Sequence, residues 1–327
     1  MCTSITYKHY FGRTLDVPFS FGEEIVITPR YYPFSFKEIH CLKTHYAMIG
    51  VAKIIEDYPL YYDATNEKGL SMAGLNFPEA HYQDYQSTKD NITPFEFIPW
   101  ILGQCSCVEE AKKLLEHINL VNISFNEETP LAPLHWIIAD QNQAITVECL
   151  KDGMRIYDND IGVLTNSPQF DIQRFVLNNY MHLSIQNPQN TFSNKIDLKA
   201  YSMGMGAIGL PGDTSSISRF VRATYTKLNA ICMDNEYDEV NQFFHILGAV
   251  KQIKGCVLVG QDYETTFYTS CCDMNNCIYY YTSYDNQQII GIDMYKEDIN
   301  GYHLIIYPLL KPQTIFIQNA KKDKPLI

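Results

Sequence analysis

The sequence predicts an α+β fold in which two antiparallel sheets lie between outer layers of helices. Strand-like segments and pairs of helix-like segments alternate along the chain, and that order is typical of layered α+β architectures. Hydrophobic residues make up 46% of the 327 residues, which provides for a large core and argues against disorder. No linker, repeat or low-complexity tract interrupts the chain. We therefore expect residues 1–327 to form a single domain.

The N-terminal part of the chain is expected to open in a sheet. Short stretches rich in β-branched and aromatic residues, bounded by turn residues, predict strands. These strands cover Ser4–Tyr7, Glu23–Thr28 and Tyr46–Lys53.

The first helix pair follows. Apolar residues at helical spacing predict a helix over Pro94–Cys105. A second helix is expected to begin at Ser106, because Ser106 and Glu109 have the spacing of a capping box ahead of the helix-forming residues Ala111–Leu115.

Strands then return, over His135–Ala139, Ala144–Leu150 and Met154–Tyr157. The last two are expected to form a hairpin, because Lys151-Asp152-Gly153 between them contains an Asp-Gly turn signal.

The second helix pair is predicted over Ser215–Leu228 and Val240–Ile253, with Asp213 or Thr214 capping its first helix. The C-terminal third alternates like an antiparallel meander. Its strands include Cys277–Thr282 and Gln287–Asp293, and Asp285-Asn286 forms a turn between them.

The charge of the chain argues against a nucleic-acid partner. The formal net charge is -12, and the densest group of lysines is a solvated tail of Lys321, Lys322 and Lys324. Binding to phosphates requires concentrated positive charge, which this sequence does not have.

The first 22 residues interrupt any apolar run with Lys8, His9, Arg13 and Asp16, so we expect neither a secretory signal nor membrane insertion. The expected location is the cytoplasm, where the ten cysteines would be reduced thiols. The cysteine clusters lack zinc-ligand spacing. We therefore expect no metal and no other cofactor.

Cys2 is the first candidate for chemistry. Removal of Met1 would leave a thiol and a free α-amine on Cys2, so that a nucleophile and a base share one Cα. Amines and thiols of this kind titrate near ~8 and ~8.5, which suits both for reaction around neutrality. The alternative is that the chain begins Met-Cys by chance.

Arg13 is the first candidate partner of Cys2. It should lie on a strand that pairs back against the first one, and a guanidinium near a thiol favours the reactive thiolate. Asp16 lies three residues further on and could hold the α-amine in position. The alternative is a surface ion pair of Arg13 and Asp16, worth ~0 to 1 kcal/mol.

Asn76 and Asn166 are each expected at the exit of a strand, in Gly74-Leu75-Asn76-Phe77-Pro78 and Leu164-Thr165-Asn166-Ser167-Pro168. Amide N–H groups there could donate to the oxyanion of a tetrahedral intermediate. The alternative is that each asparagine only caps its turn.

Arg219 and Arg222 follow the loop Gly209-Leu210-Pro211-Gly212-Asp213 and share one helix face. That face could bring a second positive charge to a site. Spacing alone is equally compatible with a solvated face.

Taken together and in order, these segments resemble the choloylglycine hydrolase family of bile salt hydrolases and penicillin V acylases, which are N-terminal-nucleophile hydrolases. The resemblance covers nearly the whole chain. Its blocks are Met1-Cys2-Thr3, Phe11-Gly12-Arg13 with Asp16, residues 66–70, residues 73–78, Leu134-His135-Trp136, residues 162–168, residues 209–213, Ser218-Arg219-Phe220 and residues 243–247.

The resemblance implies an αββα four-layer sandwich and a six-residue site. Cys2 matches the nucleophile of the family, Arg13 and Asp16 the pair beside it, Asn76 and Asn166 the oxyanion side, and Arg219 the remaining active-site arginine. A homo-oligomer, in the form of a homotetramer, is also implied by the resemblance.

The implied substrate is a bile acid joined to glycine or taurine by an amide bond. At position 76 this sequence has asparagine and so resembles the bile salt hydrolase branch of the family, whereas penicillin acylases tend to carry tyrosine there. The alternatives are a penicillin V acylase, another N-acyl amide or acyl-lactone hydrolase, and a non-catalytic binding protein that has kept the fold.

The apolar part of the substrate needs an apolar trough. Five residues match loops that flank the acyl pocket in the family, and ordinary core packing is their alternative role: Leu15, Phe21, Tyr62, Phe125 and Leu131. The loop containing Ser202-Met203-Gly204 fits neither leaving-group pattern of the family, so the choice between glycine and taurine stays open.

Overall fold

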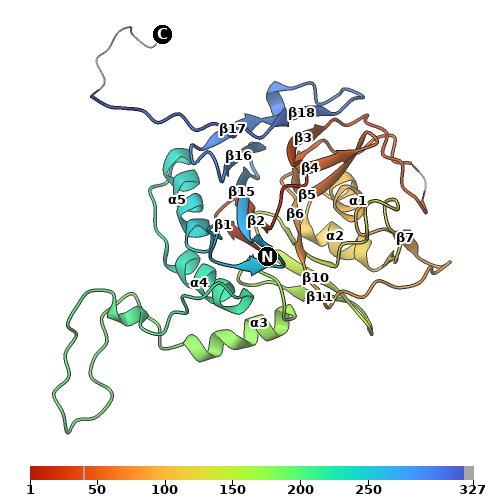
Figure 1. The fold of residues 1–327 in the computed structure, drawn as a ribbon. Coiled ribbons are helices and arrows are strands. Elements are labelled where there is room, and N and C mark those ends of the chain that lie inside the picture. The colour runs from red at the N-terminus through yellow and green to blue at the C-terminus, as the bar shows by residue number, and fades with distance from the viewer. Residues whose placement is uncertain (40, 320–327) are drawn as a thin grey trace.

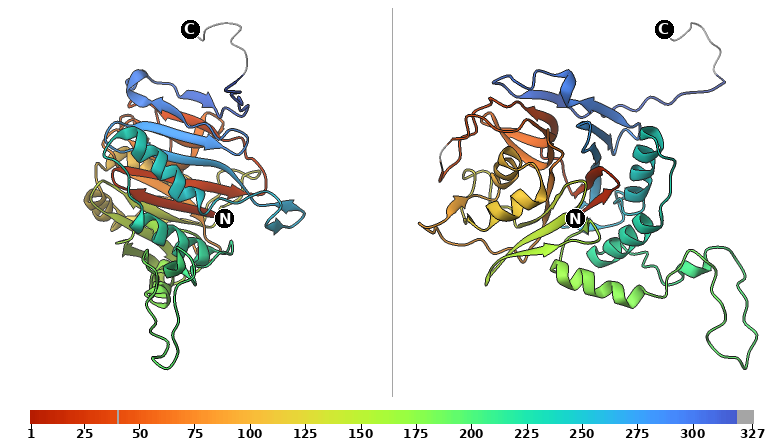
Figure 2. Two further views of the ribbon diagram at one scale, coloured as in Figure 1. Left: turned by 90° about the vertical axis from the view of Figure 1, so that its left-hand side faces the viewer. Right: turned by 180° about the vertical axis from the view of Figure 1, so that it is seen from behind.

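The computed structural model describes residues 1–39 and 41–319, which form four layers in the order helices, sheet, sheet, helices (Figures 1 and 2). The lysines at positions 321, 322 and 324 lie outside the described residues. Strands pair antiparallel throughout both large sheets. The predicted α+β sandwich is confirmed.

The first large sheet has six strands. In spatial order they are β12 (Val163–Leu164), β1 (Cys2–Tyr7), β2 (Tyr10–Val17), β15 (Thr265–Asp273), β16 (Ile278–Ser283) and β17 (Ile290–Asp293). The hairpin of β1 and β2, predicted from the sequence, therefore lies next to a strand from the C-terminal third.

The second large sheet has eight strands. In spatial order they are β11 (Gly153–Asp158), β10 (Ala144–Leu150), β9 (Leu134–Ala139), β6 (Ser71–Asn76), β5 (Tyr58–Asn66), β4 (Met48–Ile55), β3 (Glu24–Thr28) and β18 (Ile305–Pro308). β6 and β9 pair at its centre, and β6 also contacts β1 and β2 of the other sheet.

Helices cover the outer faces of both sheets (Figure 1). Helices α4 (Ser216–Asn229) and α5 (Glu236–Gly248) pack against β1, β2 and β15, and helix α1 (Phe97–Gln104) packs against β5 and β6, with α2 (Val108–Leu115) beside it. The remaining elements are α3 (Phe170–Val176), η1 (Leu177–Tyr180), η2 (Met205–Ala207), η3 (Met294–Lys296), β7 (Asp90–Ile92) paired with β8 (Ile118–Leu120), and β13 (Leu258–Val259) paired with β14 (Asp262–Tyr263).

The predicted capping box at Ser106 is wrong. Helix α2 begins at Val108, and its first N–H donates to Asp140 Oδ2 at 2.8 Å. The N–H of Ser106 donates to Glu110 rather than to Glu109. The helix is therefore capped by a residue from the turn after β9, which local spacing cannot indicate.

The predicted helix over Val240–Ile253 is shifted. Helix α5 runs from Glu236 to Gly248, and Asn235 caps it by accepting a hydrogen bond from the N–H of Asp238 at 3.1 Å. The apolar pattern starts only at Val240, because the first turn is acidic, as suits a helix N-terminus.

Of the two residues predicted to cap α4, Asp213 and Thr214, it is Asp213 whose side chain accepts hydrogen bonds at the start of the helix. Its Oδ1 accepts from the N–H of Ser215 at 2.9 Å and its Oδ2 from the hydroxyl of Ser218. Thr214 instead offers its carbonyl oxygen to Arg219 Nε at 3.1 Å. The loop before α4 thus positions Arg219.

A long excursion leaves the body between η1 and α4 (Figure 1). We call residues 181–204 the arm. Several of its apolar side chains are largely exposed, among them Met181, Phe192, Tyr201 and Met203. Its base is held to the body by Tyr225 of α4, which donates to the carbonyl oxygen of Ser184 at 3.1 Å, and the N–H of Ser184 donates to the carbonyl oxygen of Gly206 at 2.9 Å.

No helix in residues 1–39 and 41–319 is both long and apolar enough to cross a lipid bilayer. All ten cysteines are free thiols, and Cys105, Cys149, Cys271, Cys272 and Cys277 are buried like small hydrophobic residues.

Candidate active site

Cys2 is the first residue of β1 and is only 3% exposed. The register places it opposite Leu15 on β2. Its N–H donates to Asn166 Oδ1 at 2.9 Å, and its carbonyl oxygen accepts from Arg219 Nη1 at 2.5 Å. The candidate nucleophile is therefore held on both sides by side chains that lie 164 and 217 residues away in the sequence.

Met1 carries the free α-amine in this chain. Its ammonium group forms an ion pair with Glu264 and donates to the carbonyl oxygen of Asp16 at 2.7 Å. The Cys2 nitrogen is a peptide nitrogen while Met1 is attached and becomes an amine only when Met1 is cut off. The sequence did not indicate Glu264, because an isolated glutamate 263 residues away carries no pattern.

Arg13 lies on β2 and is 1% exposed, so the surface ion pair considered from the sequence does not form. Its Nη1 donates to the carbonyl oxygens of Tyr62, at 3.1 Å, and Gly74. Burial works against its charge, but nearby Cys2, Tyr268 and Asp63 raise the pKa of Arg13 above its ordinary value. Arg13 is therefore a permanent buried cation beside the thiol, and it favours the thiolate.

Asp16 is fully buried, and the expectation that it holds the α-amine of Cys2 stays a prediction, because Met1 occupies that nitrogen here. Oδ1 accepts from the hydroxyl of Thr266 at 2.6 Å, and Oδ2 accepts from that of Thr14 at 2.9 Å. The carbonyl oxygen of Asp16 accepts from the Met1 ammonium group, and its N–H donates to the carbonyl oxygen of Met1 at 3.0 Å. The contact between Thr14 and Asp16 could have been predicted from the sequence, because residues two apart on a strand lie on the same face.

The structure brings Asn76 and Asn166 together, as predicted, but gives them different roles. Asn166 Nδ2 donates to the carbonyl oxygen of Asn76 at 2.8 Å, while Asn166 Oδ1 accepts from Cys2 N–H and from Arg219 Nη2 at 2.6 Å. Two donors point at Oδ1, so the orientation of this amide is determined by its partners. Asn166 thus presents an acceptor to Cys2, and its donation to an oxyanion stays a prediction.

Asn76 is the last residue of β6, and its side chain is exposed. Its side-chain amide has no protein partner among the residues that the structure describes, so it is available to donate. Asn166 Nδ2 carries two hydrogens and uses one on Asn76, so an N–H of either asparagine can donate to an oxyanion.

Arg219 is fully buried at the first turns of α4. In addition to Cys2 and Asn166 it contacts Thr3, because Nη1 donates to Thr3 Oγ1 at 2.7 Å. Burial lowers the pKa of Arg219 from its ordinary value, whereas Asp16, Cys2 and Glu264 counteract this. Arg222 faces away from the site and donates to the carbonyl oxygens of Ala249, Pro211 and Asp213.

The five expected pocket residues divide into two groups. Leu15, opposite Cys2, and Tyr62, whose carbonyl oxygen holds Arg13, belong to the core between the sheets, and the ring of exposed Phe21 lies 6.5 Å from that of Tyr62. Phe125 and Leu131 instead pack against the core beneath α1 and α2. Exposed Phe19, which the sequence did not single out, stacks edge-on against Phe21 at 5.0 Å.

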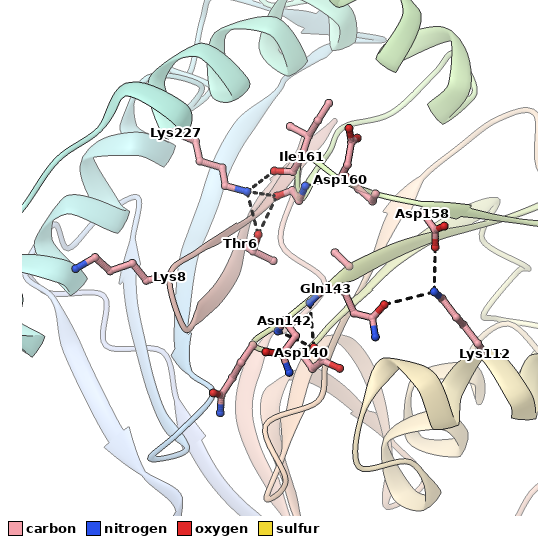
Figure 3. A pocket seen from close by; sticks show the side chains of 14 residues that line it. Thr6, Lys8, Lys112, Asp140, Asn142, Gln143, Asp158, Asp160, Ile161 and Lys227 are labelled. Atoms are coloured by element: carbon pink, nitrogen blue, oxygen red, sulfur yellow. Dashed lines mark hydrogen bonds and ion pairs between the residues drawn. The ribbon is translucent and has the colours of Figure 1, made fainter.

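A separate polar hollow of about 320 Å³ lies near the far end of β1, lined by α4, the turn before β10 and the loop after β11 (Figure 3). None of the six predicted catalytic residues lines it. Lys227 of α4 reaches Thr6 Oγ1 at 3.0 Å and the carbonyl oxygens of Ile161 and Gly162. Burial lowers the pKa of Lys227 to about 8.

This buried lysine predicts a pH dependence of stability. The unfolded chain keeps the proton of Lys227 up to its ordinary pKa of 10.5, whereas the folded chain releases it near 8. The free energy of unfolding of the wild type, relative to Lys227→Met, is therefore expected to rise by about 1–3 kcal/mol between these pH values. Urea denaturation of both proteins checks this, and a difference that does not change with pH would contradict it.

The chain is similar to known proteins along most of its length. Residues 2–307 match the linear amide C–N hydrolases of the choloylglycine hydrolase family. The chain is 55% identical over 324 residues to a bile salt hydrolase/transferase of Lactiplantibacillus plantarum, covering 98% of this chain and 100% of the relative. It is 38% identical to a bile salt hydrolase/transferase of Clostridium perfringens, covering 96% and 99%.

Solved structures are similar along the same length. A variant of the conjugated bile acid hydrolase from Clostridium perfringens superposes with a TM-score of 0.90 at 36% identity, covering 97% of this chain and all of that one. A penicillin V acylase from Agrobacterium tumefaciens has the same fold, with a TM-score of 0.73 at 21% identity and coverage of 93% and 90%.

Proposed function

This chain belongs to the choloylglycine hydrolase family of linear amide C–N hydrolases, and from that premise we propose that it hydrolyses conjugated bile salts at the amide bond between the bile acid and glycine or taurine. The observation that carries the proposal is Cys2, buried at the start of β1 with its nitrogen on Asn166 and its carbonyl oxygen on Arg219. The 55% identical relative, named a bile salt hydrolase/transferase, supports the choice of substrate.

In the proposed mechanism, removal of Met1 turns the Cys2 nitrogen into an α-amine oriented by Asn166 Oδ1. The amine takes the proton of the thiol, and the thiolate, favoured by Arg13, attacks the carbonyl carbon of the substrate amide. The oxyanion accepts a hydrogen bond from the side chain of Asn76. The intermediate collapses to a thioester as the α-amine passes its proton to the nitrogen of the departing glycine or taurine.

Hydrolysis of the thioester follows the same steps with water as the nucleophile. The α-amine takes a proton from water, hydroxide adds to the thioester carbon, and the C–S bond breaks to release the bile acid and the Cys2 thiolate. The α-amine thus acts as base, then acid, then base again, and the proton it holds at the end returns to sulfur. No metal or organic cofactor is needed in this proposal.

The apolar steroid is proposed to lie against Phe21, Tyr62 and Leu15, with Phe19 extending that surface. Burial of each ~100 Å² of hydrocarbon contributes ~2.5 kcal/mol to binding. Phe125 and Leu131 are the weaker part of the predicted pocket, because both pack against the other core.

A substrate panel tests the proposed function. We expect kcat/KM for glycocholate or taurocholate to exceed that for penicillin V by at least about 10-fold, because a trough shaped for a steroid fits the smaller phenoxyacetyl group poorly. Release of glycine, taurine or 6-aminopenicillanic acid is measured on equal amounts of enzyme. Dominant turnover of penicillin V would replace the bile salt proposal with the acylase alternative.

A homo-oligomer, as a homotetramer, is also proposed. The exposed apolar side chains of the arm support it, since Phe192, Tyr201 and Met203 are each more than four-fifths exposed in the single chain. Light scattering is expected to give about four times the chain mass of 37.7 kDa. Phe192→Asp should reduce that mass, whereas Tyr237→Asp, an exposed tyrosine on α5, should leave it unchanged; a monomeric wild type would contradict the proposal.

We propose a cytoplasmic location and a single domain spanning residues 1–327. The single domain is supported by the pairing of strands from both ends of the chain within each large sheet, β2 with β15 in one and β3 with β18 in the other.

A further inference from the structure

His135 is a buried histidine that the proposed mechanism does not use. It lies on β9 and has no exposed surface. Its Nε2 is 2.9 Å from the carbonyl oxygen of Thr165, and its Nδ1 is 2.9 Å from Glu148 Oε1 on β10. A carbonyl oxygen can only accept, so Nε2 carries a hydrogen and donates it to Thr165.

Glu148 is as completely buried as His135. Its Oε1 also accepts from the N–H of Phe170 at 3.0 Å, at the start of α3. Its Oε2 has no partner among the residues that the structure describes. A buried carboxylate with one unpaired oxygen is costly, so its place beside His135 calls for an explanation.

The imidazole ring of His135 joins the two strand exits that carry the asparagines. On one side it donates to Thr165, the residue before Asn166. On the other it stacks on the ring of Phe77, the residue after Asn76, at 4.5 Å and with the rings nearly parallel. One rigid ring thus contacts the neighbours of both asparagines, and Glu148 prevents it from rotating.

The contact between the two asparagines depends on the distance between these two strand exits. Asn166 Nδ2 donates to the carbonyl oxygen of Asn76, and this bond leaves Asn166 Oδ1 directed at Cys2. A shift of either exit would move both the acceptor for the α-amine and the donor for the oxyanion. Displacements of about 1 Å at reacting groups can cost about 100-fold in rate.

We propose that His135, held by Glu148, is a positioning residue that keeps Asn76 and Asn166 in register with Cys2. This inference rests on the proposed function, because it assigns His135 to the same amide hydrolysis. His135 does not touch the substrate, and it acts through Thr165 and Phe77.

Two substitutions of similar size separate positioning from general packing. The amide nitrogen of His135→Gln reaches the place of Nε2 and still donates to Thr165, whereas that of His135→Asn reaches only the place of Nδ1 and Glu148. We expect His135→Asn, which loses both the bond to Thr165 and the stacked ring, to lower kcat by about 10- to 100-fold with KM changed less than about 3-fold. His135→Gln loses only the stacked ring and should lower kcat by about 3- to 10-fold.

The rates are measured on whichever substrate of the panel the wild-type enzyme turns over fastest, so a wrong substrate assignment does not affect this test. Equal kcat values for the two folded variants would overturn the proposal. If either fails to fold, Phe77→Leu decides, because it removes the stacked ring; a lowered kcat supports the proposal and a wild-type kcat overturns it.

Discussion

Replacing Cys2 with alanine is expected to lower kcat for bile salt hydrolysis by about 10⁴- to 10⁶-fold, the size of loss that follows removal of a nucleophile. The side chain removed is small, so the melting temperature should move by only a few degrees. Cys149→Ala is the matched control. Cys149 is a buried thiol on β10 in the other core, and its loss should leave kcat unchanged.

The intact mass of the wild type and of each variant is measured by mass spectrometry in the same experiment. The proposed base exists only if Met1 has been removed, because the Cys2 nitrogen is otherwise part of a peptide bond. The ammonium group that pairs with Glu264 is then that of Met1. We expect the wild type and Cys2→Ala each to be short by one methionine. Activity of Cys2→Ser or Cys2→Ala equal to that of the wild type would end the proposed mechanism, as would full activity of a wild type that retains Met1.

Arg219→Met is expected to lower kcat by about 10²- to 10³-fold. The guanidinium of Arg219 holds three acceptors at the nucleophile, the carbonyl oxygen of Cys2, Thr3 Oγ1 and Asn166 Oδ1. Methionine fills similar space without donors, so Asn166 would lose the partner that fixes its orientation. The free energy of unfolding should fall by about 3 kcal/mol, because buried acceptors are left unpaired.

Arg222→Met is the control for Arg219→Met. Arg222 lies three residues further along α4 and donates to main-chain carbonyl oxygens away from Cys2. It should lower stability with kcat within about 2-fold of the wild type. If both variants lose activity in proportion to their loss of stability, then Arg219 serves the fold and not the site.

Local patterns predicted the elements whose signals are themselves local. The strand at Ala144–Leu150, the Asp-Gly turn after it and the following strand lie where they were expected, because alternation and turn residues act over a few positions. The cap of α2 could not be predicted, since Asp140 comes from the turn after β9. The start of α5 was missed because its first turn is acidic and gives no apolar signal.

The family resemblance identified the residue types of the site more fully than any spacing did. Cys2, Arg13, Asp16, Asn166 and Arg219 are all buried at one end of the first sheet, where the sequence alone allowed a surface ion pair and a solvated helix face. Glu264, Thr266 and His135 were not assigned, because each reaches the site through contacts that no short-range pattern reflects.

The sequence by itself determined which groups exist: a thiol one residue from the chain start, two arginines, two asparagines and the strands that carry them. The tertiary structure alone decided what each group does. Asn166 directs its Oδ1 at Cys2 because two donors meet there, the Cys2 N–H from 164 residues away and the Arg219 guanidinium from 53 residues away. The atom between two donors has to be the acceptor oxygen and not the amide nitrogen. Hydrogen-bond direction depends on all partners together, and those partners meet only in the folded chain.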